Sequence, residues 1–521
     1  MKLARYFRSS VFLCILVGFL VLSGCTTTGT TASATSSLQD SIKYVFYFIG
    51  DGMGSAQIHL TEAYLASVKE GYNDNKPESE KTEDLIFTQF PAMGMITTYC
   101  ANRFITDSAA AGTALACGEK TMTEVVSLKQ DKQTRLNTIA ERAKAKGMKV
   151  GIVTSVGIDH ATPAVFYAHE PDRDNYYNIG VQLANSDFDY FAGGSLHQPT
   201  PPRARMRRRG EISDANAVEP KSSYEVAADN GFKIVTSREE LSTCKPGERV
   251  IAYNKSEEGM NQLTPEIDRP DNCMSLAEFT EKGINLLDNN QGFFMMVEGG
   301  QVDYACHDKD TVTAINEILA FDEAIDKAMD FYKEHPDETL IVVTADHETG
   351  GLTMGNGLSE YSTSFEILKN QNMSYAAFKD NVWSKYTSGQ WGGVEDNIPD
   401  ALKTDIENAF GLVYDKLNDY EKDLLEDAYD KGMSSAKRVR VNIHEYSQED
   451  KLLYSDNDPL SITLVGILAE KAGIGWTTFA HTGIPVEVHA IGSGSEIFNG
   501  FYDNTDVPKK MAKLIGIELG N

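Results

Sequence analysis

Five apolar runs, at 44–49, 150–155, 293–297, 339–344 and 486–491, predict buried strands. The first is continuous and rich in aromatic and β-branched residues, which is typical of a parallel strand covered on both faces. Helical patterns lie between several of these runs. One, at 136–146, ends at a glycine, and a longer one that follows residue 307 places its isoleucines on one side. This alternation predicts an α/β fold with a central, mostly parallel sheet and helices on both faces.

The alternation lapses between residues 356 and 475. This segment contains Trp383, Trp391 and an acidic helical stretch at 420–429, but little strand pattern. We therefore predict an α/β domain formed by 41–355 and 476–521, interrupted by an inserted subdomain at 356–475. The acidic run at 456–458 lacks the full pattern of a calcium loop and is interpreted as a turn.

The first 25 residues have the features of a targeting segment. Three basic residues precede an apolar stretch at 11–22, which is short for a membrane span. The sequence Leu22-Ser23-Gly24-Cys25 resembles a bacterial lipobox, and this implies cleavage before Cys25 and lipid attachment to it. An ordinary signal peptide that contains a cysteine is the alternative. We expect an exported protein in the bacterial periplasm or at the cell surface, anchored by lipid at Cys25 through a Ser/Thr-rich tether at 26–40. No later stretch is expected to span a membrane.

The charge and cysteine content of the chain limit the partners and the covalent bridges that can be expected. The formal net charge of -28 argues against nucleic acid, whose phosphate backbone binds surfaces rich in Lys and Arg. The Arg-containing stretch at 196–222 is therefore interpreted as a surface loop. An odd number of cysteines without CxxC spacing fits neither a disulfide framework nor a thiolate zinc site, although one or two bridges remain open. The cysteines beyond the leader are Cys100, Cys117, Cys244, Cys273 and Cys306.

Polar residues of the kinds that bind ligands gather where the predicted strands end. Asp51 lies in the glycine turn at 50–54. The third glycine of this turn is spaced wrongly for dinucleotide binding, and no helix is expected directly after it. Other strand ends or their loops present Thr162, Glu298, Asp303, His307, Asp346, His347 and His481. Asp303 and His307 are four residues apart and would share one face of a helix. Because open α/β sheets bind ligands at the carboxyl ends of their strands, we expect these side chains to meet at one edge.

This set of side chains predicts bound metal ions. Mixed Asp and His ligands suit Zn²⁺, whereas carboxylates with a hydroxyl, such as Asp51, Glu298 and Thr162, suit the harder Mg²⁺. So many carboxylates and histidines at one sheet edge are hard to explain without metal.

A serine near these ligands is the candidate nucleophile. Asp107 is the predicted N-cap of a helix that begins at Ser108, and the alanines that follow are strong helix formers. The Ser108 hydroxyl would then lie at a positive helix terminus, where free backbone N–H groups favour an anion such as phosphate. No Gly-x-Ser-x-Gly elbow surrounds Ser108, so a Ser-His-Asp hydrolase is poorly supported.

Together these motifs resemble those of the alkaline phosphatase family. The matching segments, in family order, are 48–54, 106–110, 160–163, Arg173, 297–307, 344–347 and 481–483. Any one of them is a weak signal, but the ordered set is specific, and the resemblance extends from about residue 44 to 505 outside the insert. It implies an alkaline-phosphatase-like catalytic domain with 356–475 as a cap- or crown-like subdomain.

The resemblance implies hydrolysis of phosphate monoesters through a phosphoserine intermediate, with release of inorganic phosphate. Ser108 would be the nucleophile, and Arg173 would bind phosphate oxygens with His160 beside it. Small phosphate monoesters are the expected partners. The resemblance also suggests a homodimer.

The same resemblance implies two Zn²⁺ and one Mg²⁺. The first zinc would be held by Asp303, His307 and His481, and the second by Asp51, Asp346 and His347. The magnesium would be held by Asp51, Thr162 and Glu298.

Two positions depart from the family pattern. His160 stands where some members carry Asp, which leaves the identity of the third metal open. Cys306 precedes His307 where an acidic residue can occur. The remaining histidines are interpreted as structural: His59, His169, His197, His335, His444 and His489.

Two other functions remain as alternatives. The nearest is a metal-dependent phosphodiesterase or sulfatase-like relative that uses the same metal sites. The other is a surface lipoprotein that binds metal or a partner without turnover. The serine nucleophile and the complete set for a third metal favour phosphate monoesters.

Overall fold

A computed structural model describes residues 42–69, 82–202, 220–257, 259–388, 397–436 and 447–520. The leader, Cys25, the tether, Trp391 and His444 lie outside the described residues. No helix in the described ranges combines the length and hydropathy that a membrane span needs.

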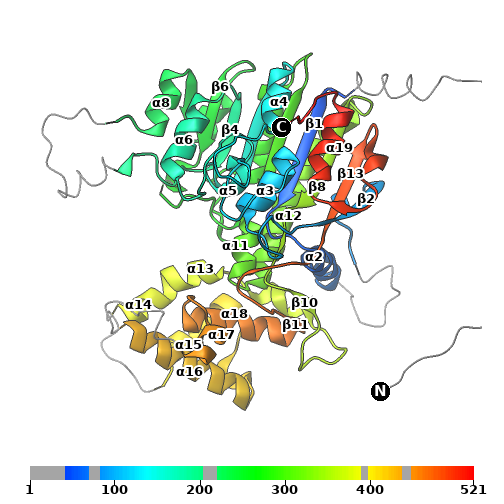
Figure 1. Ribbon diagram of the computed structural model, residues 1–521. Helices are drawn as coiled ribbons and strands as arrows, with labels where there is room; N and C mark the ends of the chain where they lie inside the picture. The colour runs from blue at the N-terminus through cyan, green and yellow to red at the C-terminus, as the bar shows by residue number, and fades with distance from the viewer. Residues whose placement is uncertain are drawn as a thin grey trace, which may run out of the picture.

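A ten-stranded sheet organises the molecule (Figure 1), with the strand order β14-β2-β13-β8-β1-β7-β3-β4-β6-β5. Its strands are β1 (Tyr44–Gly50), β2 (Ala92–Thr97), β3 (Lys149–Gly157), β4 (Tyr190–Gly194), β5 (Phe232–Val235), β6 (Arg249–Tyr253), β7 (Phe293–Gly299), β8 (Thr339–Ala345), β13 (Val486–Gly492) and β14 (Gly500–Asp503). Among these ten strands, β13 alone runs antiparallel to its neighbours, β2 and β8. The prediction of a mostly parallel sheet is confirmed, and each predicted strand is present.

Alternate side chains of β1 contact helices on opposite faces of the sheet. Phe48 packs on Phe321 of α12 (Thr311–Glu334), with ring centroids 5.7 Å apart. Tyr47 points the other way, toward Phe166 at 6.0 Å, and its hydroxyl lies 3.5 Å from the Leu115 carbonyl in α3 (Ser108–Cys117). Burying each such aromatic side chain contributes about 1.5–3 kcal/mol. Helices therefore cover both faces, as predicted.

The other helices around the sheet follow from local signals in the sequence. Thr138 and Glu141 form a capping box at the start of α4, and Ser275 and Glu278 form another at the start of α10. These surrounding helices are α2 (Ser55–Ser67), α4 (Ile139–Ala145), α5 (Ala161–Ala164), α6 (Tyr176–Asn185), α8 (Ser223–Asp229), α9 (Arg238–Ser242), α10 (Leu276–Leu287), α11 (Gln301–His307) and α19 (Asp506–Leu514).

The described residues between 356 and 475 are mainly helical and form a lobe below the sheet in Figure 1, drawn in yellow and orange. The lobe contains α13 (Tyr375–Ala377), a π-helix (Phe378–Trp383), α14 (Ser384–Thr387), α15 (Asp400–Phe410), α16 (Asp419–Ala436), α17 (Gln448–Leu453) and α18 (Pro459–Ala472). A second hydrophobic cluster fills the lobe, where Trp383 is 2% exposed, and extends to Leu60 of α2 and Ile315 of α12. Asp458 caps α18 and accepts a hydrogen bond from the Trp383 indole at 2.8 Å. At the base of the lobe, β10 (Thr353–Met354) pairs with β11 (Ile474–Gly475).

The structure decides two local features, the segment after the glycine turn and the pairing of the cysteines. A helix does follow the glycine turn at 50–54, because α2 begins at Ser55 with Gly54 in an extended conformation as its N-cap. The expectation that no helix would follow was therefore wrong. The five cysteines beyond the leader are all buried and form no disulfide, which settles the question of bridges that the sequence left open.

Candidate active site

The register of the central strands brings the candidate ligands to one edge. Gly50 at the end of β1 is level with Gly299 of β7 and with Ala345 of β8. Asp51 and Asp346 therefore follow neighbouring strands at the same height, and Glu298 lies one residue earlier on β7. The expectation of a shared site at the carboxyl ends of the strands is confirmed.

The turn after β1 depends on a glycine at position 52. Gly52 has a φ of 72°, in the left-handed region that favours glycine. A Cβ there would lie 2.9 Å from the Asp303 Cα, so a side chain has no room. The Gly52 backbone N–H also donates to Asp346 Oδ1 at 3.2 Å. This turn thus brings β1 close to both neighbouring ligand segments.

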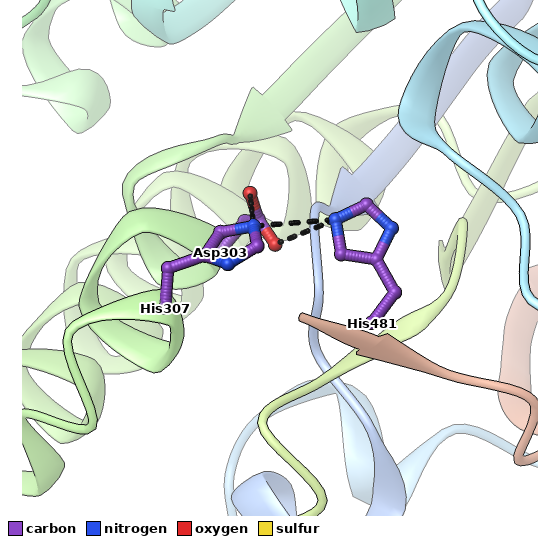
Figure 2. A group of neighbouring side chains, drawn as sticks. All are labelled: Asp303, His307 and His481. Atoms are coloured by element: carbon purple, nitrogen blue, oxygen red, sulfur yellow. Dashed lines mark hydrogen bonds and ion pairs between the residues drawn. The ribbon is translucent and has the colours of Figure 1, made fainter. Parts of the chain in front are cut away.

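The first ligand group consists of Asp303 and His307 on α11 and His481 on β12 (His481–Thr482), as Figure 2 shows. His307 Nε2 lies 3.2 Å from Asp303 Oδ2 and 3.2 Å from His481 Nε2. The Nδ1 atoms point away from the group, His307 to the Phe479 carbonyl at 2.6 Å and His481 to the Thr106 carbonyl at 2.8 Å. These carbonyls hold both rings with Nε2 facing the group, as second partners of metal-binding histidines do.

The second group consists of Asp51, Asp346 and His347, all fully buried. His347 Nε2 lies 3.2 Å from Asp51 Oδ1 and 3.4 Å from Asp346 Oδ2. The Ser108 Oγ is 3.3 Å from the same nitrogen. The candidate nucleophile therefore adjoins the point where these three side chains meet.

The third group consists of Asp51, His160 and Glu298, so Asp51 belongs to two groups. The Thr162 hydroxyl donates to Asp51 Oδ2 at 3.1 Å. Glu298 Oε2 accepts a hydrogen bond of 2.6 Å from the Thr154 hydroxyl of β3. Thr162 was expected in this group, and His160 was expected beside the phosphate at a position that bears on the identity of the third metal. The geometry places His160 itself among the potential ligands.

Ser108 is the first residue of α3, and Asp107 caps this helix by accepting the Ala110 backbone N–H at 3.2 Å. The predicted N-cap is confirmed. Arg173 lies next to the same terminus: one guanidinium nitrogen is 3.5 Å from Asp107 Oδ2, and another donates to His160 Nε2 at 2.9 Å. A serine hydroxyl, a helix N-terminus and a guanidinium thus face one small region, which suits a phosphoryl group.

Burial and neighbouring charges perturb the ionisation of these groups strongly. Burial, and then the charge of Asp346, raise the pKa of Asp51 well above its usual range. Burial would also raise the pKa of Asp303, but His307 and His481 hold it well below that range. For His347, burial lowers the pKa well below 6.5. Such strong perturbation is characteristic of functional sites.

The side chains present fit bound cations. In the described part of the chain, Asp51 Oδ1, Glu298 Oε1 and Asp346 Oδ2 are buried and have no hydrogen bond. Several buried carboxylates in one place would repel one another unless positive charge lies between them. Imidazole nitrogens with carboxylates suit zinc, and a group with more oxygen donors suits magnesium. Cys306 is not among the ligands, since its buried thiol faces Gln57, with 4.0 Å from Sγ to the amide nitrogen.

Comparison with known proteins agrees with this geometry. A profile of alkaline phosphatase matches residues 42–517. The chain belongs to the alkaline phosphatase family. Alkaline phosphatase 3 of Bacillus subtilis (strain 168) is 31% identical over 481 residues, which cover 92% of this chain and 90% of that protein.

Solved alkaline phosphatases share the fold. The crystal structure of a cold-active alkaline phosphatase from Shewanella sp. has a TM-score of 0.69 and 29% identity, over 91% of this chain and 99% of that one. The Thermus thermophilus alkaline phosphatase has a TM-score of 0.68 at 23% identity, over 94% and 96% of the two chains, and shows the fold. Membership identifies the chain as a phosphoric monoester hydrolase, and the metal dependence of the family agrees with the three ligand groups.

Several supporting residues were missed by the sequence analysis. Thr154 lies directly opposite Glu298 in the register of β3 and β7. The Thr349 hydroxyl donates to Asp303 Oδ1 at 2.5 Å. Glu348 accepts from Gln57 at 2.7 Å and also from the Thr482 hydroxyl, so it braces the segments that carry His347 and His481. The only signal for these residues was their proximity in sequence to predicted ligands, because strand register cannot be read from one sequence.

Proposed function

We propose that this alkaline phosphatase works through a phosphoserine at Ser108. Ser108 Oγ forms a bond to phosphorus as the bond to the leaving alcohol breaks. A water oxygen then bonds to phosphorus, and the bond to Ser108 Oγ breaks, which releases inorganic phosphate and restores the serine. The observation that carries this proposal is the 3.3 Å separation between Ser108 Oγ and His347 Nε2, at the N-terminus of α3.

The surrounding residues bind and orient the phosphoryl group. Arg173, next to Ser108, has a planar guanidinium that matches two phosphate oxygens. Backbone N–H groups in the first turn of α3 favour the same negative charge. The first two groups would hold metal ions, whose Lewis acidity would favour an ionised serine and stabilise charge on the entering and leaving oxygens. These groups are placed to stabilise the negative charge of the phosphoryl group during its transfer.

We assign the groups around Asp303 and Asp346 to Zn²⁺, and the group around Glu298, which has more oxygen donors, to Mg²⁺. The shared carboxylate of Asp51 joins the second and third groups. His160 adds a nitrogen donor to the third group, so zinc competes with magnesium there more strongly than at an all-oxygen site. Metal analysis of the purified protein tests this assignment, and a third site filled by zinc at equal metal concentrations would contradict the magnesium assignment.

The finer features of location and assembly are also proposals. Export and lipid attachment at Cys25 rest on the leader, and mass spectrometry of the amino-terminal peptide tests them. The division into a catalytic domain (41–355 and 476–521) and a cap or crown (356–475) is supported by the second hydrophobic cluster, which consists mostly of lobe residues, and by the β10–β11 pair at the base of the lobe. A homodimer is proposed from the resemblance alone, and a monomeric mass in solution would reject it.

Hydrolysis assays test the proposed reaction. The protein without its leader is assayed on an aryl phosphate monoester and the matching diester, with and without zinc and magnesium. We expect a monoester preference of several orders of magnitude that is lost on chelation and restored by the metals. A preference for the diester would contradict the proposal and favour the phosphodiesterase alternative.

A further inference from the structure

His197 lies in the loop after β4, and its position is determined by a buried carboxylate. Asp159 Oδ2 accepts the His197 backbone N–H at 2.9 Å, and Asp159 Oδ1 contacts His197 Nδ1 at 2.7 Å. The Asp159 side chain is fully buried. A carboxylate can only accept, so Nδ1 carries the hydrogen, and the imidazole is fixed in orientation.

The fixed ring of His197 packs against two segments of the active site. It stacks on Tyr176 with centroids 4.4 Å apart and an interplanar angle of 15°. It also lies nearly parallel to His160, at 6.3 Å and 30°. Tyr176 begins α6, three residues after Arg173. His197 therefore contacts both the segment that carries Arg173 and the segment that carries His160.

The segment that carries Arg173 and the segment that carries His160 also contact each other directly, through these two side chains. Arg173 donates to His160 Nε2 at 2.9 Å, and its other side-chain partner, Asp107 Oδ2, is more distant at 3.5 Å. The Arg173 backbone N–H donates to the Glu124 carbonyl at 2.8 Å, and this backbone bond does not itself set the direction of the long side chain. The direction of the guanidinium thus depends on where the His160 ring lies.

The His197 ring lies in close contact with the backbone at Gly157. A Cβ at Gly157, at the end of β3, would lie 2.4 Å from His197 Cε1. Gly157 is three residues before His160, so the chain passes against the His197 ring immediately before it presents the His160 ring. A side chain at position 157 would press on the imidazole and also on the Asn261 carbonyl, which is 2.9 Å from that Cβ.

We propose that His197, held by Asp159, is a positioning residue for the phosphate-binding pair of Arg173 and His160. It touches neither substrate nor the reacting atoms. Its ring fixes the separation of the two segments, so that the guanidinium is already oriented when phosphate arrives. The inference rests on the proposed role of Arg173 in binding phosphate.

The main test is the affinity of the metal-loaded enzyme for inorganic phosphate in His197→Asn, measured by calorimetry and as competitive inhibition. The asparagine amide can replace Nδ1 as donor to Asp159, but it removes the ring. We expect phosphate affinity to fall about tenfold and KM to rise by a similar factor, since a misplaced arginine loses a charged hydrogen bond.

The matched control is His169→Asn. His169 is a buried histidine whose ring contacts the Ser127 carbonyl at 2.8 Å and Glu141 at 3.0 Å, neither of which is a side-chain partner of Arg173. Thermal unfolding of both variants shows that they fold, and we expect only His197→Asn to lose phosphate affinity. Equal phosphate affinity in the two variants would overturn the proposal. Gly157→Ala displaces the ring without removing it, and should also weaken phosphate binding if His197→Asn does not fold.

Arg173→Ala separates this inference from the one on which it rests. If Arg173→Ala leaves phosphate affinity unchanged, then the proposed role of Arg173 is wrong. If Arg173→Ala weakens binding and His197→Asn does not, then the positioning role alone is wrong. We expect His197→Asn to have little further effect on phosphate affinity in the Arg173→Ala background, because the two residues act through one contact.

Discussion

A buried glutamate on α12 should make the protein less stable as the pH rises. Glu317 is 6% exposed and accepts the backbone N–H of Glu266 at 2.6 Å. Burial raises its pKa to about 8, with the nearby carboxylates of Glu266 and Asp268 acting in the same direction. We therefore choose Glu317→Gln, which keeps an acceptor for that N–H but cannot ionise.

The sign and size of the effect follow from linkage. Glu317 takes up its proton with a pKa of about 8 in the folded protein, against 4.5 without these surroundings. Its contribution to stability is therefore complete below about pH 4.5, declines as the pH rises, and is lost above about pH 8. One pKa unit corresponds to about 1.4 kcal/mol, so the full loss is on the order of 5 kcal/mol. The glutamine in Glu317→Gln cannot ionise, so the variant should not lose this free energy of unfolding as the pH rises.

Urea unfolding of both proteins at several values between about pH 5 and pH 9 measures the difference. We expect Glu317→Gln to gain stability relative to the wild type by up to about 1.4 kcal/mol per pH unit until about pH 8, and by nothing further above it. Groups common to both proteins cancel in this difference. Glu334→Gln, at an exposed position of the same helix, controls for the loss of one negative charge. Parallel curves for wild type and Glu317→Gln would refute the reasoning.

Three further substitutions test individual residues near the site and in the lobe. Thr154→Val removes the donor to Glu298, and should raise the magnesium concentration needed to reactivate metal-stripped enzyme by about 10- to 100-fold; an unchanged titration would contradict this. Gly52→Ala forces a Cβ against the Asp303 backbone in a left-handed turn, and should lower kcat/KM on an aryl phosphate by about tenfold or more; wild-type kinetics would show that the turn adapts. Asp458→Ala removes both the N-cap of α18 and the acceptor of the Trp383 indole N–H, and should lower the free energy of unfolding by about 2–4 kcal/mol in urea while activity is retained; an unchanged midpoint would contradict this.

Much of the fold could be predicted from the sequence because local patterns agree with the global architecture. The buried strand at 44–50 is apolar throughout, since helices cover both of its faces. Asp107 before an alanine run predicted the start of α3, because capping is a local interaction. The ligands could be expected at one edge because parallel strands end together, so that Asp51, Asp346 and Glu298 meet without any further assumption.

The rest depends on information that a single sequence does not contain. Thr154 supports Glu298 only because β3 and β7 are neighbours in a particular register. His197 was interpreted as structural, and its contacts with Tyr176 and His160 arise between loops that are distant in sequence. The helix after Gly54 was missed because a glycine-rich turn followed by a short polar stretch carries no strong start signal.

The central claim, that the phosphoryl group passes through Ser108, is tested most directly by trapping it. The metal-loaded enzyme is mixed with a phosphate monoester and quenched in acid, and its peptides are examined by mass spectrometry. We expect one phosphoryl group on Ser108 in the wild type. It should be absent from Ser108→Ala, which should retain its metals but lose turnover. Hydrolysis at the wild-type rate by Ser108→Ala, or turnover with no phosphate on Ser108, would contradict the claim.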